Sequence, residues 1–142
     1  MTETQKANEE KKEFLNRYRA LRKRVRHFEE EIETVRSQYT GRAIQYSDMP
    51  KAHNTEHDLS DYAARVDDML REIEALRWEC INAYHFISSA IEDMTDDREK
   101  DLLRLRYLMC KSWEEVAVDM GYNIRWVYRI HGNALQHFNK PF

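Results

Sequence analysis

Two arginines near the C-terminus, Arg125 and Arg129, carry chemistry suited to nucleic acid. A guanidinium group can hold a phosphate or donate two parallel hydrogen bonds to guanine. The two residues lie four positions apart, so both would project from one face of a helix. The chain from Met120 to Phe142 contains no Asp or Glu, although the whole protein has a formal net charge of −3. This locally basic segment can therefore meet a phosphate backbone even though the chain as a whole is mildly acidic.

Three neighbouring residues complete the candidate DNA-binding set, and each has a structural alternative. Asn123 can cap a helix or contact DNA, and capping is the favoured interpretation. Tyr128 can contact a phosphate or a thymine methyl group, or it can pack inside the protein. Trp126 fits a half-buried position better than a base contact. The candidate DNA-binding residues are Asn123, Arg125, Trp126, Tyr128 and Arg129.

Gly132 is unusual in a segment with helical spacing, because glycine costs about 1 kcal/mol relative to alanine inside a helix. It either permits a close approach of the backbone to DNA or to another helix, or it marks an irregularity. The sequence favours none of these interpretations over the others.

Capping and turn signals predict the two helices that would position these residues. Ser112 and Glu115 form an S-x-x-E capping box that opens the first helix. Ala117 is small enough for two helices to cross closely, and Gly121 can take the positive φ of a sharp turn. The apolar residues at the inward positions are Val116, Met120, Tyr122, Val127 and Ile130. Residues 112–138 are therefore predicted to form a helix-turn-helix.

Two seams of apolar residues predict a long antiparallel helical hairpin before this motif. The spacings alternate between three and four, the heptad pattern of helices that pack along one another. The first seam is Phe14, Tyr18, Leu21, Val25, Phe28, Ile32, Val35 and Tyr39, and the second is Leu59, Tyr62, Val66, Met69, Ile73, Leu76, Cys80, Ala83 and Ile87. Tyr39 would lie opposite Leu59. Gly41 and Pro50 predict a loop at residues 40–57, after which Asp58 is the expected N-cap.

The predicted fold class is all-α, with a coiled-coil-like hairpin at residues 1–94 and a three-helix unit at residues 95–142. Asp96 and Glu99 form a second capping pattern, and the helix that they open is expected to run to about Cys110. Residues 78–91 are apolar on nearly every side, so they should be covered on more than one face. The covering surfaces would be the first helix, the C-terminal unit and a second copy of the chain. The hairpin is therefore the expected site of homodimerisation.

A basic run at residues 16–27 carries six Arg and Lys and no acidic residue. A nucleic-acid contact is one interpretation of such a run. A solvated helix face, partly paired with Glu72, Glu74 and Glu79 of the second helix, is the favoured one.

The sequence contains no signal for catalysis, a cofactor or a membrane span. Cys80 and Cys110 are too few and too far apart for a disulfide framework or a zinc site. His53 and His57 have metal-ligand spacing, but they lie in the predicted loop without a further clear ligand, so no metal site is expected. No nucleophile with a base, paired acid and base, or phosphate-binding glycine loop predicts an enzyme. Without a signal peptide or a long apolar run, the expected location is the cytoplasm.

The segment DLLRLRYLMCKSWEEVAVDMGYNIRWVYRIHGNALQHF resembles region 4 of sigma-70 type RNA polymerase sigma factors. The matching features are the Leu/Arg-rich stretch at residues 102–108, the W-E-E-V-A segment from Trp113, Gly121, and the V-x-x-I-x-x-x-A-L run from Val127. The whole layout, with the Y-S-D-M-P-K segment from Tyr46, is similar to small phage or prophage proteins grouped with ArpU-like late transcription regulators.

This resemblance implies a DNA-binding module whose second helix enters the major groove. It also implies that residues 101–111 are a candidate surface for RNA polymerase. The chain has nothing like the sigma region that melts promoters, so a complete sigma factor is not expected. The second helix is aromatic-rich and only weakly basic, which leaves room for a protein partner.

Three functions therefore compete. The favoured one is a regulator of phage transcription that binds double-stranded DNA as a homodimer. The second is a DNA-packaging recognition subunit, similar to a small terminase, which would form rings. The third is a protein-interaction module that acts on RNA polymerase or a sigma factor without binding DNA.

Overall fold

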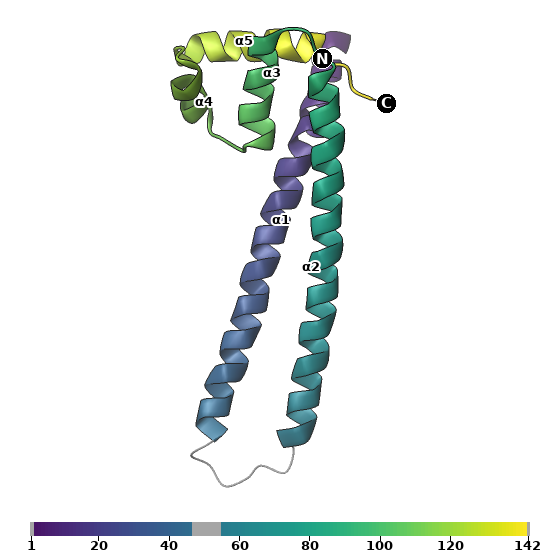
Figure 1. Ribbon diagram of the computed structural model, residues 1–142, viewed down its shortest axis with the longest axis vertical. Helices are drawn as coiled ribbons and strands as arrows, with labels where there is room; N and C mark the ends of the chain where they lie inside the picture. Colours follow the sequence, from purple (N-terminus) through teal and green to yellow (C-terminus); the bar gives the residue numbers. More distant parts are fainter. Residues whose placement is uncertain (1, 47–54, 142) are drawn as a thin grey trace. The chain divides into compact units, whose positions relative to one another are not determined.

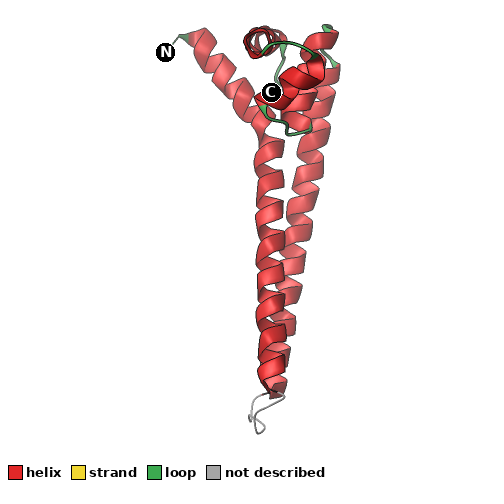
Figure 2. Ribbon diagram, turned by 90° about the vertical axis from the view of Figure 1, so that its left-hand side faces the viewer, coloured by secondary structure: helices red, strands yellow, loops and turns green. Residues whose placement is uncertain are grey.

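The computed structural model describes the backbone of residues 2–46 and 55–141, and the side chains within residues 2–39 and 59–141. The described residues form five α-helices and one π-helical segment, and no strand occurs among them (Figure 2). The predicted all-α fold class is confirmed. His53 and His57 lie outside the residues whose side chains are described. The chain divides into two compact units, Met1–Leu21 with Cys80–Phe142, and Arg22–Glu79.

The two long helices are α1 (Glu3–Tyr46) and α2 (Thr55–Glu92). Both extend into the loop that the sequence predicts at residues 40–57, so those loop boundaries are wrong. A single glycine such as Gly41 costs a long helix only about 1 kcal/mol, whereas each added residue gains a backbone hydrogen bond. The predicted N-cap at Asp58 is also wrong, because it lies inside α2. An acidic residue suits the first turn of a helix as well as its cap.

Within the unit Arg22–Glu79, α1 and α2 lie side by side and antiparallel (Figure 1). The seam residues Ile32 and Ile73 are buried, at 6% and 2% exposure. Tyr39 stacks on Tyr62 with ring centroids 3.8 Å apart, whereas Leu59 is 53% exposed. The predicted pairing of Tyr39 with Leu59 is therefore displaced by about one turn. A seam that repeats every turn presents the same stripe after a slip of one turn, so its spacing does not fix the register.

Residues 22–27 of the basic run belong to this unit, and two of them lie near acidic residues of α2. Arg24 and His27 line one shallow groove together with Glu72 and Glu79. All four groups are exposed to solvent. Exposed side chains suit both interpretations of residues 16–27, the solvated face and the nucleic-acid contact, so the favoured one stays a prediction.

The other unit contains α3 (Asp97–Leu103), the π-helical segment η1 (Arg104–Leu108), α4 (Trp113–Met120) and α5 (Ile124–His137). The first part of α1 and the last part of α2 belong to the same core. Leu15 is fully buried there, and the rings of Phe14 and Phe138 lie 5.9 Å apart. The domain boundary predicted at residues 94 and 95 does not coincide with this division. Three short helices bury too little apolar surface alone, and the helix ends enlarge their core.

The apolar segment at residues 78–91 of α2 has one buried and one exposed face. Ile87 and Ile91 are buried at 1% and 0% exposure, whereas Ile81 and Phe86 are 49% and 55% exposed. The predicted cover by the first helix and by the C-terminal helices is found on the buried face, where Leu15 and Leu102 share one core with Ile87 and Ile91. Cover of the exposed face by a second copy of the chain stays a prediction.

The helix that begins at Asp97 ends close to the predicted position. The amide of Met109 donates to the carbonyl of Arg104 at 2.8 Å, which closes the π-helical turn, and Cys110 follows with φ 57°. A positive φ at a residue other than glycine is uncommon, and it turns the chain sharply toward α4. The last part of the predicted helix is thus π-helical, a widening that spacing does not indicate.

Candidate nucleic-acid interface

A tight turn joins α4 to α5. The Oγ atom of Ser112 accepts a hydrogen bond from the amide of Glu115 at 3.2 Å and caps α4, as the capping signal predicts. Gly121 ends α4 with φ 73° and ψ 29°, and the amide of Tyr122 donates to the carbonyl of Ala117 at 3.0 Å. A Cβ atom built at Gly121 meets no heavy atom within 4 Å. The turn therefore requires glycine for its positive φ and not for lack of space.

Asn123 caps the start of α5. Its Oδ1 atom accepts a hydrogen bond from the amide of Trp126 at 2.8 Å, so the capping interpretation of Asn123 is confirmed. The cap satisfies one of the backbone amides that a helix start leaves without a partner. Helix α5 therefore begins at a defined residue, immediately before the two arginines.

Helix α5 has one buried face and one face that is exposed to solvent. The buried face holds Val127, Ile130 and Ala134, at 0%, 6% and 0% exposure. On the opposite side lie residues at positions i, i+4, i+7 and i+11, which a helix brings into one line. We call this line the outer stripe, and its members are Arg125, Arg129, Gly132 and Gln136. Arg125, Arg129 and Gln136 are exposed, so both guanidinium groups face away from the core.

The two aromatic candidates flank the outer stripe and are half-exposed. Trp126 is 38% exposed, and the guanidinium carbon of Arg129 lies 5.6 Å from the centroid of its ring. Tyr128 is 48% exposed and packs edge-on against Trp113, with centroids 5.4 Å apart. The half-buried position expected for Trp126 is observed. Tyr128 combines packing with an exposed surface, so its two interpretations are compatible.

Gly132 has no internal explanation in the described structure. Helix α5 runs without a break from Ile124 to His137, so the irregularity considered for Gly132 is not found. A Cβ atom built at this glycine meets no heavy atom within 4 Å. Alanine would fit there and would stabilise the helix by about 1 kcal/mol.

A buried polar pair joins α5 to η1, and none of the sequence motifs described above includes it. The hydroxyl of Tyr107 and Nε2 of His131 are hydrogen-bonded at 2.7 Å. Burial lowers the pKa of His131 to about 4 and raises the pKa of Tyr107 to about 12, so both side chains are neutral at pH 7. The signal that could have found His131 is its spacing, because it continues the apolar face of Val127 and Ile130.

Arg106 fixes the segment between η1 and α4. Its guanidinium carbon lies 4.5 Å from the centroid of the Trp113 ring, and Nη1 donates to the carbonyl of Lys111 at 2.9 Å. Desolvation is the main cause that lowers the pKa of Arg106, and the positive charge of Arg19 adds to it. The resemblance to region 4 makes residues 101–111 a candidate polymerase surface, and here Arg106 is partly buried whereas Met109 is 58% exposed.

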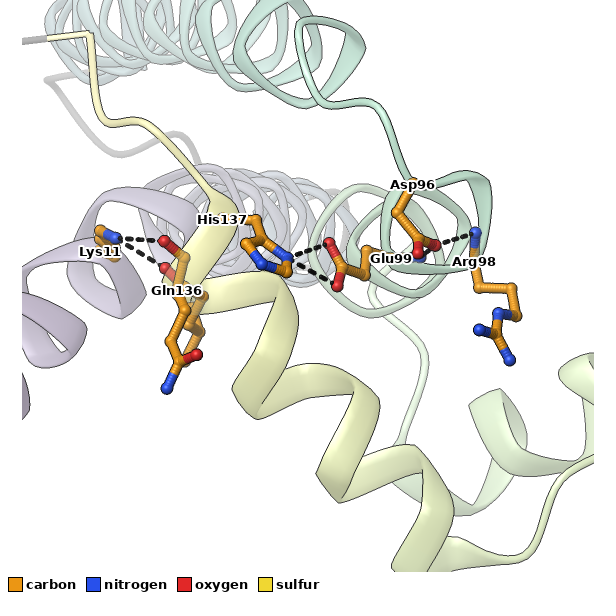
Figure 3. A network of polar contacts seen from close by, with 7 residues as sticks. Lys11, Asp96, Arg98, Glu99, Gln136 and His137 are labelled. Carbon is orange, nitrogen blue, oxygen red and sulfur yellow. Dashed lines mark hydrogen bonds and ion pairs between the residues drawn. The ribbon is translucent and has the colours of Figure 1, made fainter.

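Two contacts hold the C-terminal end of α5, as Figure 3 shows. Nζ of Lys11 donates to the carbonyl of Leu135 at 2.7 Å, and a cation at this end also suits the helix dipole. Nδ1 of His137 donates to the buried carboxylate of Glu99 at 2.9 Å. Glu99 was expected in a capping pattern. Asp96 does cap α3, accepting from the amide of Glu99 at 3.1 Å, but the Glu99 side chain binds His137 instead of completing a reciprocal cap.

Among the described residues, no helix combines the length and apolar character that a membrane span requires. No protein-family model matches the chain, and neither curated proteins nor solved structures show significant similarity to it.

Proposed function

We propose that α4 and α5 form a DNA-binding helix-turn-helix of the sigma region 4 type, in a regulator of phage or prophage transcription. The observation that carries this proposal is the outer stripe. It presents Arg125 and Arg129 to solvent from a helix that contains no acidic residue. An α-helix fits the major groove of DNA, where arginine binds phosphates or the edge of guanine.

The start of α5 supports the same proposal. In helix-turn-helix proteins the N-terminal residues of the second helix contact the bases. Here Arg125 lies in the first turn, and Asn123 fixes where that turn begins. The guanidinium group of Arg129 lies 5.6 Å from the centre of the Trp126 ring, and we expect this contact to narrow the conformations of Arg129. A restricted side chain loses less conformational entropy when it binds.

A homodimer is part of the proposal, because paired half-sites raise the affinity of a small module. The exposed apolar side chains of Ile81 and Phe86 on α2 support it. Sedimentation should give the mass of two chains. A larger ring would instead favour the DNA-packaging function.

The direct test is a titration of a fluorescent mixed-sequence duplex, followed by anisotropy at several salt concentrations. The wild-type protein should bind at low salt and weaken steeply as salt increases. The double variant R125A/R129A should bind more weakly, with a slope of log Kd against log salt that is smaller by about 2, because each lost phosphate contact removes about 0.9.

The matched control is R65A/R71A, which removes two exposed arginines from α2 and leaves α5 unchanged. This control should bind like the wild type. The proposal fails if the wild-type protein does not bind the duplex at low salt, or if the two double variants bind equally.

One observation favours a protein-interaction module as the second candidate. Val118 on α4 is 80% exposed, and Trp126 and Tyr128 of α5 are half-exposed, so this face offers apolar contacts as well as charge. If the protein is such a module, the wild-type form should not bind DNA and should co-purify with RNA polymerase. The variant Val118→Asp should then abolish that co-purification.

A further inference from the structure

Gly132 occupies the outer stripe without a structural reason inside the described chain. A Cβ atom would meet no heavy atom within 4 Å, and the helix continues through this position. Gly121, in contrast, is the glycine with positive φ among the described residues. Neither packing nor a turn therefore accounts for Gly132. A residue that weakens its own helix without an internal gain is expected where function requires it.

The position of Gly132 along α5 indicates what approaches it. Gly132 lies on the same face as Arg125 and about 10 Å farther along the helix axis. The major groove is about 12 Å wide, and a recognition helix enters it with its N-terminal end. When Arg125 contacts a base edge, the helix at Gly132 passes the sugar–phosphate strand at the border of the groove.

We infer that Gly132 is the point where α5 makes its closest approach to a DNA strand. This inference rests on the proposed function. A side chain at this position adds a layer of atoms between the helix and the strand. It thereby moves the guanidinium group of Arg129, one turn away on the same face, out of contact with DNA.

The chemistry around Gly132 favours DNA over a protein helix. A second helix that packed closely on a glycine would need apolar side chains beside it to bury. The neighbours of Gly132 on the outer stripe are instead the exposed Arg129 and Gln136. The exposed Tyr128, one turn away, offers a hydroxyl that can donate to a phosphate as well as a ring. Helix α5 carries no carboxylate that would repel phosphate. A negatively charged, hydrogen-bond-accepting strand matches this surface.

The test compares the full-length variants Gly132→Ala and Gly132→Gln with the wild-type protein. Thermal unfolding should show a rise in Tm of about 3 °C for Gly132→Ala, because alanine favours the helix. Anisotropy titration of the duplex should show binding about tenfold weaker for Gly132→Ala. Gly132→Gln should weaken binding further, because its side chain is larger.

The matched control is Asn133→Ala, which also improves helix propensity, at an exposed position beside the outer stripe. This variant should raise Tm and leave Kd unchanged. A Gly132→Ala protein with raised Tm and unchanged Kd overturns the inference but leaves the proposed function standing. A Gly132→Ala protein with lowered Tm also overturns it, because glycine would then have an internal role. If the wild-type protein does not bind the duplex, both the inference about Gly132 and the proposed function are refuted.

Discussion

Acidification should destabilise this fold through His131, whose buried imidazole is kept neutral. Burial is the main cause that lowers its pKa from 6.5 to about 4, and the charges of Lys12 and Arg106 add to it. As pH falls, the unfolded chain binds a proton at His131 near pH 6.5, whereas the folded chain binds one only near pH 4. The free energy of unfolding therefore falls through this window. At about 1.36 kcal/mol per pH unit, the loss from this residue reaches about 3 kcal/mol.

The measurement is urea unfolding at a series of pH values, for the wild-type protein and for His131→Gln. Glutamine does not titrate but can still form a hydrogen bond with Tyr107. Because every other titrating group is common to both proteins, the difference between their stabilities isolates His131. The free energy of unfolding of the wild type, minus that of His131→Gln, should fall by about 3 kcal/mol between neutral pH and about pH 4. A difference that stays constant across this range would refute the assignment of a buried, neutral histidine.

Two further predictions concern the turn and the cap that place α5. Gly121→Ala should lower the free energy of unfolding by about 1 kcal/mol, because alanine disfavours a φ of 73°. Gly132→Ala is the matched control, because neither glycine has a heavy atom within 4 Å of its built Cβ atom. The control should raise the free energy of unfolding. If Gly121→Ala raised it as well, the role of the positive φ at Gly121 would be contradicted. Asn123→Ala should cost about 1 kcal/mol in urea unfolding, because the amide of Trp126 loses its partner, whereas Asn123→Asp, which keeps an acceptor, should stay near wild type.

The features that the sequence predicted well depend on residues a few positions apart. Ser112 and Asn123 cap their helices because the capping oxygen and the amide that it binds are three residues apart. Gly121 turns the chain because its own backbone tolerates a positive φ. The exposure of Arg125 and Arg129 follows from the opposite face, where the apolar spacing of Val127 and Ile130 places the core.

The features that the sequence did not predict depend on residues far apart in the chain. Glu99 satisfied a local capping pattern, yet its carboxylate binds His137 across 38 positions. Lys11 holds the end of α5 across 124 positions, and no local pattern distinguishes it from other exposed lysines. The fully buried Leu15 lies one residue from the predicted seam. Its burial is decided by the core that the start of α1 shares with the C-terminal helices and not by the heptad spacing.

By itself, the sequence determined that the chain is helical, where the C-terminal helices begin, and which face of α5 is apolar, because propensity, capping and periodicity act within one or two turns. Only the tertiary structure decided that Tyr39 stacks on Tyr62, that Tyr107 and His131 are paired in the core, and that Gly132 is open on its outer side. These features arise when side chains from different helices compete for the same space. A periodic sequence offers several nearly equivalent ways to fill that space, and packing selects one.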